Sequence, residues 1–274
     1  MKFTHLSDLA DQFDVFLIDQ FGVLIDGSGA YDGAVPALRF LLDAGKKIIV
    51  LTNSGKRAAH SRARLERHGF PMANAQVVSS GEVAWALLAA RFAEQSKPLA
   101  VWYEAVTTDA SPLDGLNIRF AEDIREADLV MIAGVRSEDA ALGTYEAGFR
   151  YAIQRKVPCI CTNPDRERLT SKGVRFAAGQ IATLYQDMGG QVEWIGKPYR
   201  AMYDYAISLA PAGAKMLCLG DSVAHDIKGA QAAGLPSALV LTGLAGDLKK
   251  EEISDLCRQN DVWPDYLLPA FTLA

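Results

Sequence analysis

Reactive side chains follow four short apolar runs of this sequence, each one or two residues beyond the end of its run: Asp19, Thr52, Lys197 and Asp221. A fifth reactive residue, Asp226, lies five positions after Asp221. An aspartate can attack phosphorus and form an acyl phosphate, and neighbouring carboxylates are ligands of the kind that Mg²⁺ prefers. The set predicts metal-assisted phosphoryl chemistry if the fold brings these residues together.

The amine and hydroxyl groups fit the same chemistry. The Lys197 ammonium would place a positive charge between Asp19 and a phosphoryl group. The Thr52 hydroxyl and the backbone N–H groups of Asn53 and Ser54 would donate hydrogen bonds to phosphoryl oxygens. Taken singly, each residue has an ordinary explanation as a helix cap, a turn former or a solvated charge. Their order along the chain favours one shared site.

Short apolar runs predict the strands that carry these residues. They are rich in Val, Ile and Leu at consecutive positions, which is typical of parallel strands covered on both faces. Nine such runs occur, at Val15–Ile18, Lys47–Leu51, Gln76–Val78, Leu99–Trp102, Leu129–Ala133, Pro158–Cys161, Val192–Ile195, Met216–Leu219 and Ala238–Leu241. Helical patterns alternate with them, which predicts an α/β fold with right-handed crossovers. In such a fold ligands bind beyond the carboxyl ends of the strands.

Composition and charge exclude several classes of protein. The 274 residues are 50% hydrophobic and 22% charged, with a net charge of -5, so no basic surplus suggests a nucleic-acid partner. The apolar runs are far shorter than the roughly 20 residues that span a bilayer, so we expect no membrane partner. The polar start does not resemble a signal peptide, and the four cysteines form no CxxC pair. We therefore expect a reduced, cytoplasmic protein.

These residues resemble the conserved motifs of the haloacid dehalogenase (HAD) superfamily. Four segments are similar, in order, to its four motifs: Asp19–Leu24, Thr52–Ser54, Lys197 and Gly220–Asp226. In addition, Thr162-Asn163-Pro164-Asp165 matches a signature of class IIA, the branch with NagD-like and p-nitrophenyl-phosphatase-like members. Gly196-Lys197-Pro198 has that branch's form of the third motif. The resemblance covers nearly the whole chain.

The resemblance implies a Rossmann-like parallel-sheet core with an inserted α/β cap domain. The step of 145 positions from Thr52 to Lys197 leaves room for such an insertion, because a βαβ crossover unit needs only about 30 residues. We expect the cap, which would determine substrate specificity, at residues 80–190. The core would then comprise residues 1–79 and 191–274.

The resemblance also implies a hydrolase that is a Mg²⁺-dependent phosphatase of phosphate monoesters. Asp19 would be the nucleophile that forms an aspartyl-phosphate intermediate, with Lys197 and Thr52 as further catalytic residues. The metal ligands would be Asp19, the backbone carbonyl of Phe21, Asp221 and Asp226. Caps of this kind often mediate dimers in the resembling family, so a homodimer is among the options.

The expected substrate is a small phosphorylated metabolite such as a sugar phosphate or a nucleotide. Asn163, Asp165 and Arg166 come directly after a predicted strand of the cap, where loops tend to face a ligand. We therefore expect these three residues to bind substrate, together with Asn53 and Ser54 near the second motif.

Phe21 departs from the pattern of the resembling phosphatases. They carry an aspartate at this position, which protonates the leaving group, whereas phenylalanine cannot transfer a proton. An aromatic residue here resembles the haloacid dehalogenases themselves, which need no proton donor at this position, so a dehalogenase is one alternative. Because a positioned general acid contributes about 10²–10⁴-fold, a catalytically weak phospho-ligand-binding protein is another. The acidic fourth motif and the long insert favour the phosphatase. Asp26 and His225 are candidates to replace the missing acid.

Overall fold

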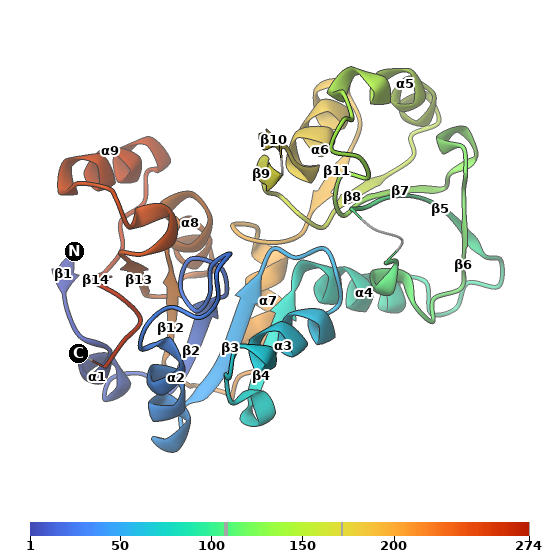
Figure 1. The fold of residues 1–274 in the computed structure, drawn as a ribbon. Helices are drawn as coiled ribbons and strands as arrows, with labels where there is room; N and C mark the ends of the chain where they lie inside the picture. Colours follow the sequence, from blue (N-terminus) through green and yellow to red (C-terminus); the bar gives the residue numbers. More distant parts are fainter. Residues whose placement is uncertain (107–108, 171, 274) are drawn as a thin grey trace. The chain divides into compact units, whose positions relative to one another are not determined.

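The computed structural model describes residues 1–106, 109–170 and 172–273. The chain divides into two compact units (Figure 1). The first unit comprises Met1–Thr52, Ala59–Val78 and Lys197–Ala274, and the second comprises Asn53–Ala58 and Ser79–Gly196. Each unit contains a sheet of its own.

The first unit is built on a seven-stranded sheet in the order β1-β14-β13-β12-β2-β3-β4. Its strands are β1 (Lys2–Phe3), β2 (Val15–Asp19), β3 (Lys47–Thr52), β4 (Ala75–Ser79), β12 (Met216–Gly220), β13 (Ser237–Val240) and β14 (Tyr266–Leu268). The central strand β2 pairs in parallel with β12 on one side and with β3 on the other. All five residues of β2 are buried, as expected for a strand covered on both faces.

Helices alternate with the strands of this sheet along the chain (Figure 1). They are α1 (Leu6–Ala10), α2 (Ala34–Asp43), α3 (Ala58–Arg67), α7 (Arg200–Ser208), α8 (Lys228–Ala233) and α9 (Lys250–Asn260). In α2, for example, Leu38 and Leu41 are buried on one face, and Gly45 follows the helix with a φ of 72°. No helix in the described ranges combines the length and the apolar character needed for a membrane crossing.

The second unit contains a five-stranded sheet in the order β11-β8-β7-β5-β6 and a separate antiparallel pair, β9 with β10. The strands are β5 (Leu99–Glu104), β6 (Ile118–Phe120), β7 (Leu129–Ile132), β8 (Cys159–Cys161), β9 (Glu167–Thr170), β10 (Gly173–Phe176) and β11 (Val192–Trp194). Its helices are α4 (Ser80–Arg91), α5 (Glu146–Gln154) and α6 (Ala178–Asp187). Phe149 of α5 and Tyr185 of α6 pack edge to face in the core of this unit.

The fold class predicted from the apolar runs is confirmed, because all nine runs form strands and the two larger sheets are parallel. One expectation about their arrangement is wrong. The run at Val192–Ile195 forms β11, which pairs with β8 at the edge of the second sheet rather than joining the first. Residues 53–58 also fall in the second unit, so its bounds differ from the 80–190 expected for the cap.

Candidate active site

Parallel pairing brings three of the predicted residues to one edge of the first sheet. Asp19 is the last residue of β2 and lies opposite Leu51 of β3, so Thr52 comes one position further along. Leu219 of β12 lies opposite Ile18, and Asp221 therefore follows the end of β12 at the same edge. The side chains of Asp19, Thr52 and Asp221 are all buried.

Three carboxylates converge at this edge. One oxygen from each of Asp19, Asp221 and Asp226 lies within 4.8 Å of the others. Glycines make room for two of them. A Cβ on Gly220 would stand 2.0 Å from Asp226 Cγ, and one on Gly22 would stand 2.1 Å from Asp221 Oδ2. A compact, buried set of oxygen ligands fits a hard divalent cation.

Lys197 is the counterion of the cluster. Its Nζ donates a hydrogen bond to Asp226 Oδ1 at 2.7 Å and another to Asp19 Oδ1. The side chain is 5% exposed. The sequence predicts that Lys197 follows a strand of the same sheet as the carboxylates. In the structure Lys197 lies in the loop after β11, which is a strand of the other sheet.

Burial controls the protonation of these groups. It raises the pKa of the Asp19 carboxyl well above the ordinary value, an effect that the Lys197 ammonium opposes. Burial raises the pKa of Asp221 to about 6, and the charge of Asp226 adds to this effect. Burial alone would lower the pKa of Lys197, but the two neighbouring carboxylates outweigh it and raise the pKa. One ammonium thus faces three carboxyl groups, and a divalent cation would offset the excess negative charge.

Backbone groups that the sequence analysis missed hold two of the carboxylates. The N–H of Leu244 donates to Asp221 Oδ2 at 2.6 Å, from a short 3₁₀ helix, Gly243–Ala245, that follows β13. The N–H of Ser222 donates to Asp226 Oδ2 at 3.2 Å, and Asp226 lies in a π-helical turn, Val223–Ile227. Backbone donors have no residue-type signature, although the Gly243 that precedes Leu244, with a φ of 50°, marks a tight turn.

The position of the missing acid is taken by an exposed aromatic ring. Phe21 is 43% exposed, and the guanidinium of Arg64 lies 5.2 Å from its ring centroid. Asp26 accepts hydrogen bonds from the hydroxyl of Ser28 and from the N–H groups of Ser28 and Gly29, which hold its pKa below the ordinary value and make it a poor proton donor. The metal contact expected of the Phe21 carbonyl stays a prediction.

His225, the other candidate acid, interacts through its ring. Its Nδ1 lies 3.0 Å from the hydroxyl of Ser222, which also caps the π-helical turn by accepting from the His225 N–H. This contact is typical of a histidine near a helical N-terminus. A role in proton transfer stays a prediction.

The residues expected to bind substrate lie in the second unit. Asn53 Nδ2 donates to Asp165 Oδ1 at 2.9 Å, and the Asp165 N–H donates to Asn163 Oδ1 at 3.1 Å. Arg166 is exposed. Ser54 and Asn163 line a cavity of about 140 Å³, together with Gly55, Lys56, Tyr103, Ala105, Val106, Asp109 and Ala133.

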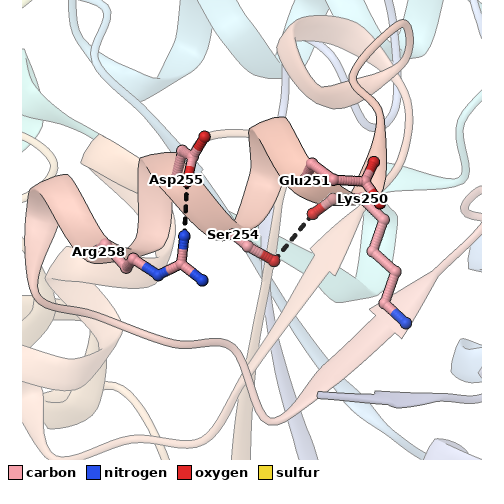
Figure 2. A pocket seen from close by; sticks show the side chains of 5 residues that line it. All are labelled: Lys250, Glu251, Ser254, Asp255 and Arg258. Carbon is pink, nitrogen blue, oxygen red and sulfur yellow. Dashed lines mark hydrogen bonds and ion pairs between the residues drawn. The ribbon is translucent and has the colours of Figure 1, made fainter.

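Another depression, of about 230 Å³, lies along helix α9 (Figure 2). It is lined by Lys250, Glu251, Ser254, Asp255 and Arg258 of this one helix. Arg258 pairs with Asp255 at 2.6 Å, and the Ser254 hydroxyl donates to the Lys250 carbonyl. These are local contacts of an exposed helix face, and we assign the depression no role.

Comparison with known proteins identifies the family. A model described as haloacid dehalogenase-like hydrolase matches residues 16–114, and a second, described as HAD-hydrolase-like, matches residues 194–272. The chain belongs to the haloacid dehalogenase-like hydrolases. The class IIA resemblance and the prediction of a hydrolase are thereby confirmed, since named p-nitrophenyl phosphatases are among its relatives and structural neighbours.

Two relatives of this HAD-like hydrolase are glycerol phosphate phosphatases. D-glycerol 3-phosphate phosphatase of Mycobacterium tuberculosis is 29% identical over 240 residues, which cover 87% of this chain and 66% of that protein's own length. Glycerol-3-phosphate phosphatase of Homo sapiens is 29% identical over 305 residues, which cover 96% of this chain and 92% of that protein.

Two solved structures share its fold. A haloacid dehalogenase-like hydrolase from Brucella suis has a TM-score of 0.80 at 26% identity, covering 97% of this chain and 98% of the other. A glycerol phosphate phosphatase from Mycobacterium tuberculosis, in complex with magnesium, has a TM-score of 0.73 at 23% identity. It covers 98% of this chain and 77% of the other.

Proposed function

We propose that this HAD-like hydrolase is a Mg²⁺-dependent phosphatase that acts on a small phosphorylated metabolite. The observation that carries the proposal is the convergence of three buried carboxylates with one buried lysine at the end of β2. Relatives named as phosphatases, including sugar and glycerol phosphatases, support the reaction class and the substrate class. The second unit would select the leaving group.

The donor set fits Mg²⁺, because its side-chain ligands are all carboxylate oxygens. Asp19, Asp221 and Asp226 would hold the ion, together with the backbone carbonyl of Phe21. When bound, the ion would neutralise charge on the phosphoryl oxygens and reduce their repulsion of the Asp19 carboxylate. The magnesium complex of the mycobacterial phosphatase supports this choice of cation.

Asp19 would act as the nucleophile. An oxygen of its carboxylate forms a bond to phosphorus while the bond from phosphorus to the ester oxygen breaks, which leaves an aspartyl phosphate and an alkoxide. Water then attacks phosphorus, releases inorganic phosphate and restores the Asp19 carboxylate. Lys197, Thr52 and the N–H groups of Asn53 and Ser54 would stabilise the charge that develops on the phosphoryl oxygens.

The leaving alkoxide needs a proton that Phe21 cannot give. In this proposal the proton comes from water, and the enzyme therefore favours esters with acidic leaving groups. The buried carboxylate cluster argues against the dehalogenase alternative, because displacement of a halide requires no cation site. A protein that only binds a phosphorylated ligand would show binding without turnover.

A panel of phosphomonoesters assayed with Mg²⁺ and with a chelator tests the proposal. We expect phosphate release with Mg²⁺, no release with the chelator, and the fastest turnover for p-nitrophenyl phosphate. If the protein releases halide from haloacids, and does so equally well in the presence of chelator, the result would support a dehalogenase instead. Binding of a phosphoester without any turnover would support the phospho-ligand-binding protein.

A further inference from the structure

The side chain of Asn53 is held by an acceptor that is itself fixed. Asn53 Nδ2 donates to Asp165 Oδ1 at 2.9 Å. The backbone N–H of Asp165 donates to Asn163 Oδ1 at 3.1 Å, and its carbonyl accepts from the N–H of Gly179 at 2.9 Å. A carboxylate held in this way orients the amide that donates to it.

Gly196 packs against the same amide. Its φ is 119°, and a Cβ there would stand 2.9 Å from Asn53 Oδ1 and 2.7 Å from both Ser80 Oγ and Pro164 Cδ. Gly81 adds to this packing, since its N–H donates to the Ser54 carbonyl at 3.1 Å. The segment that begins at Asn53 is therefore held by side-chain, backbone and steric contacts within the second unit.

Single peptide bonds join this cluster to two residues of the candidate active site. Asn53 directly follows Thr52, and Gly196 directly precedes Lys197. In the proposed function the backbone N–H of Asn53 donates to a phosphoryl oxygen. We propose that Asp165 is a positioning residue, which fixes the Asn53 backbone N–H for the phosphoryl group.

This inference rests on the proposed function and gives Asp165 a role different from the expected contact with the leaving group. The two roles differ in what they change. Loss of a leaving-group contact weakens the reaction of one ester more than another. Loss of a positioning contact weakens the reaction of every ester equally, and it also weakens the binding of inorganic phosphate, which has no leaving group.

The experiment compares Asp165→Ala with wild type on p-nitrophenyl phosphate and glycerol phosphate. We expect kcat/KM for both esters to fall by the same factor, roughly tenfold for one charge-assisted hydrogen bond. We expect the Kd of inorganic phosphate, measured by calorimetry with Mg²⁺, to rise by a similar factor. Asp165→Asn keeps an acceptor oxygen and should recover most of both losses.

Two further variants separate positioning from a general effect on folding. Asn53→Ala removes the donor of the hydrogen bond. In the double variant with Asp165→Ala, kcat/KM and the affinity for phosphate should fall no further than in either single variant. Asp139→Ala is the control, because it removes an exposed carboxylate of the same unit that pairs with Lys172. It should change neither kcat/KM nor the Kd of phosphate.

A fall in kcat/KM for only one of the two esters, with an unchanged Kd of phosphate, would overturn the inference and indicate that Asp165 contacts the leaving group. Equal affinity and turnover in Asp165→Ala and wild type would also overturn it. If wild type binds phosphate but hydrolyses no ester, the proposed function fails, while the Kd values still decide the role of Asp165. If wild type binds no phosphate, both proposals fail.

Discussion

The ammonium of Lys197 donates to Asp226 at 2.7 Å and also to Asp19, although 178 residues separate Lys197 from Asp19 in the chain. After β4 the chain enters the long segment Ser79–Gly196 of the second unit, and it returns to the first unit at Lys197. The positive charge at the candidate active site therefore comes from a residue far from Asp19 in the sequence but in the same unit. This relationship leads to the first prediction.

Replacing Lys197 with methionine removes the counterion of three buried carboxyl groups. Breaking a buried ion pair on one side typically costs about 3–5 kcal/mol, so we expect a lower unfolding temperature in chelator and partial recovery with Mg²⁺. Turnover should fall by about 10² or more, because the variant lacks the ammonium charge that would stabilise the negative phosphoryl oxygens. Differential scanning calorimetry and steady-state kinetics measure the two effects.

Lys172→Met is the control for that variant, since it breaks an exposed pair with Asp139. Exposed pairs contribute about 0–1 kcal/mol, so its unfolding temperature and turnover should stay close to those of wild type. Equal behaviour of the two lysine variants would contradict the role given to Lys197.

Protons should compete with Mg²⁺ for the carboxylates. The pKa of Asp221 is raised to about 6, first by burial and then by the charge of Asp226. Below that pH the carboxyl is protonated and cannot bind a cation, so the affinity for Mg²⁺ should decrease as the pH falls from 7.5 to 5.5. Calorimetric titration with MgCl₂ across this range measures the trend. A pH-independent affinity would speak against Asp221 as a ligand.

Phe21→Asp should supply the missing proton donor. We expect faster turnover, with a larger gain for glycerol phosphate than for p-nitrophenyl phosphate, because an alkoxide needs protonation more than a nitrophenolate does. A general acid contributes up to about 10²–10⁴-fold. Phe21→Leu is the control, since it also removes the aromatic ring but introduces no acid. If the two variants have equal rates on both esters, the missing acid does not limit this enzyme.

Gly220→Ala should disturb the metal site by steric contact alone. The added Cβ would stand 2.0 Å from Asp226 Cγ, so the carboxylate must move. We expect at least tenfold weaker Mg²⁺ binding, about 1.4 kcal/mol. Gly27→Ala is the control, because no atom lies within 4 Å of the Cβ position there. Unchanged Mg²⁺ affinity in Gly220→Ala would show that Mg²⁺ binding does not depend on the position of the Asp226 carboxylate.

The sequence was sufficient to predict nine of the strands and the three residues of the carboxylate cluster. The nine runs are rich in apolar residues at consecutive positions; Asp19 directly follows one of them, and Asp221 lies two residues beyond another. The sheet to which a run belongs depends on strand pairing between distant segments, so the sequence does not reveal that β11 pairs with β8 in the second sheet.

Other features leave little signal in the sequence. Strand β9 begins with two adjacent charged residues, and β10 has an arginine between two apolar residues, so neither strand is marked by an apolar run. The contact between Leu244 and Asp221 uses a backbone N–H, which any residue other than proline supplies. The hydrogen bond from Asn53 to Asp165 joins residues 112 positions apart, which spacing alone cannot pair.

The most direct test of the central claim is mass spectrometry of the Asp19 peptide after rapid acid quench of a single turnover with Mg²⁺ and p-nitrophenyl phosphate. The account predicts a transient phosphate on Asp19, with no turnover in Asp19→Asn and no phosphopeptide when a chelator replaces Mg²⁺. Full turnover by Asp19→Asn, or phosphate release from wild type through a phosphorylated residue other than Asp19, would contradict it.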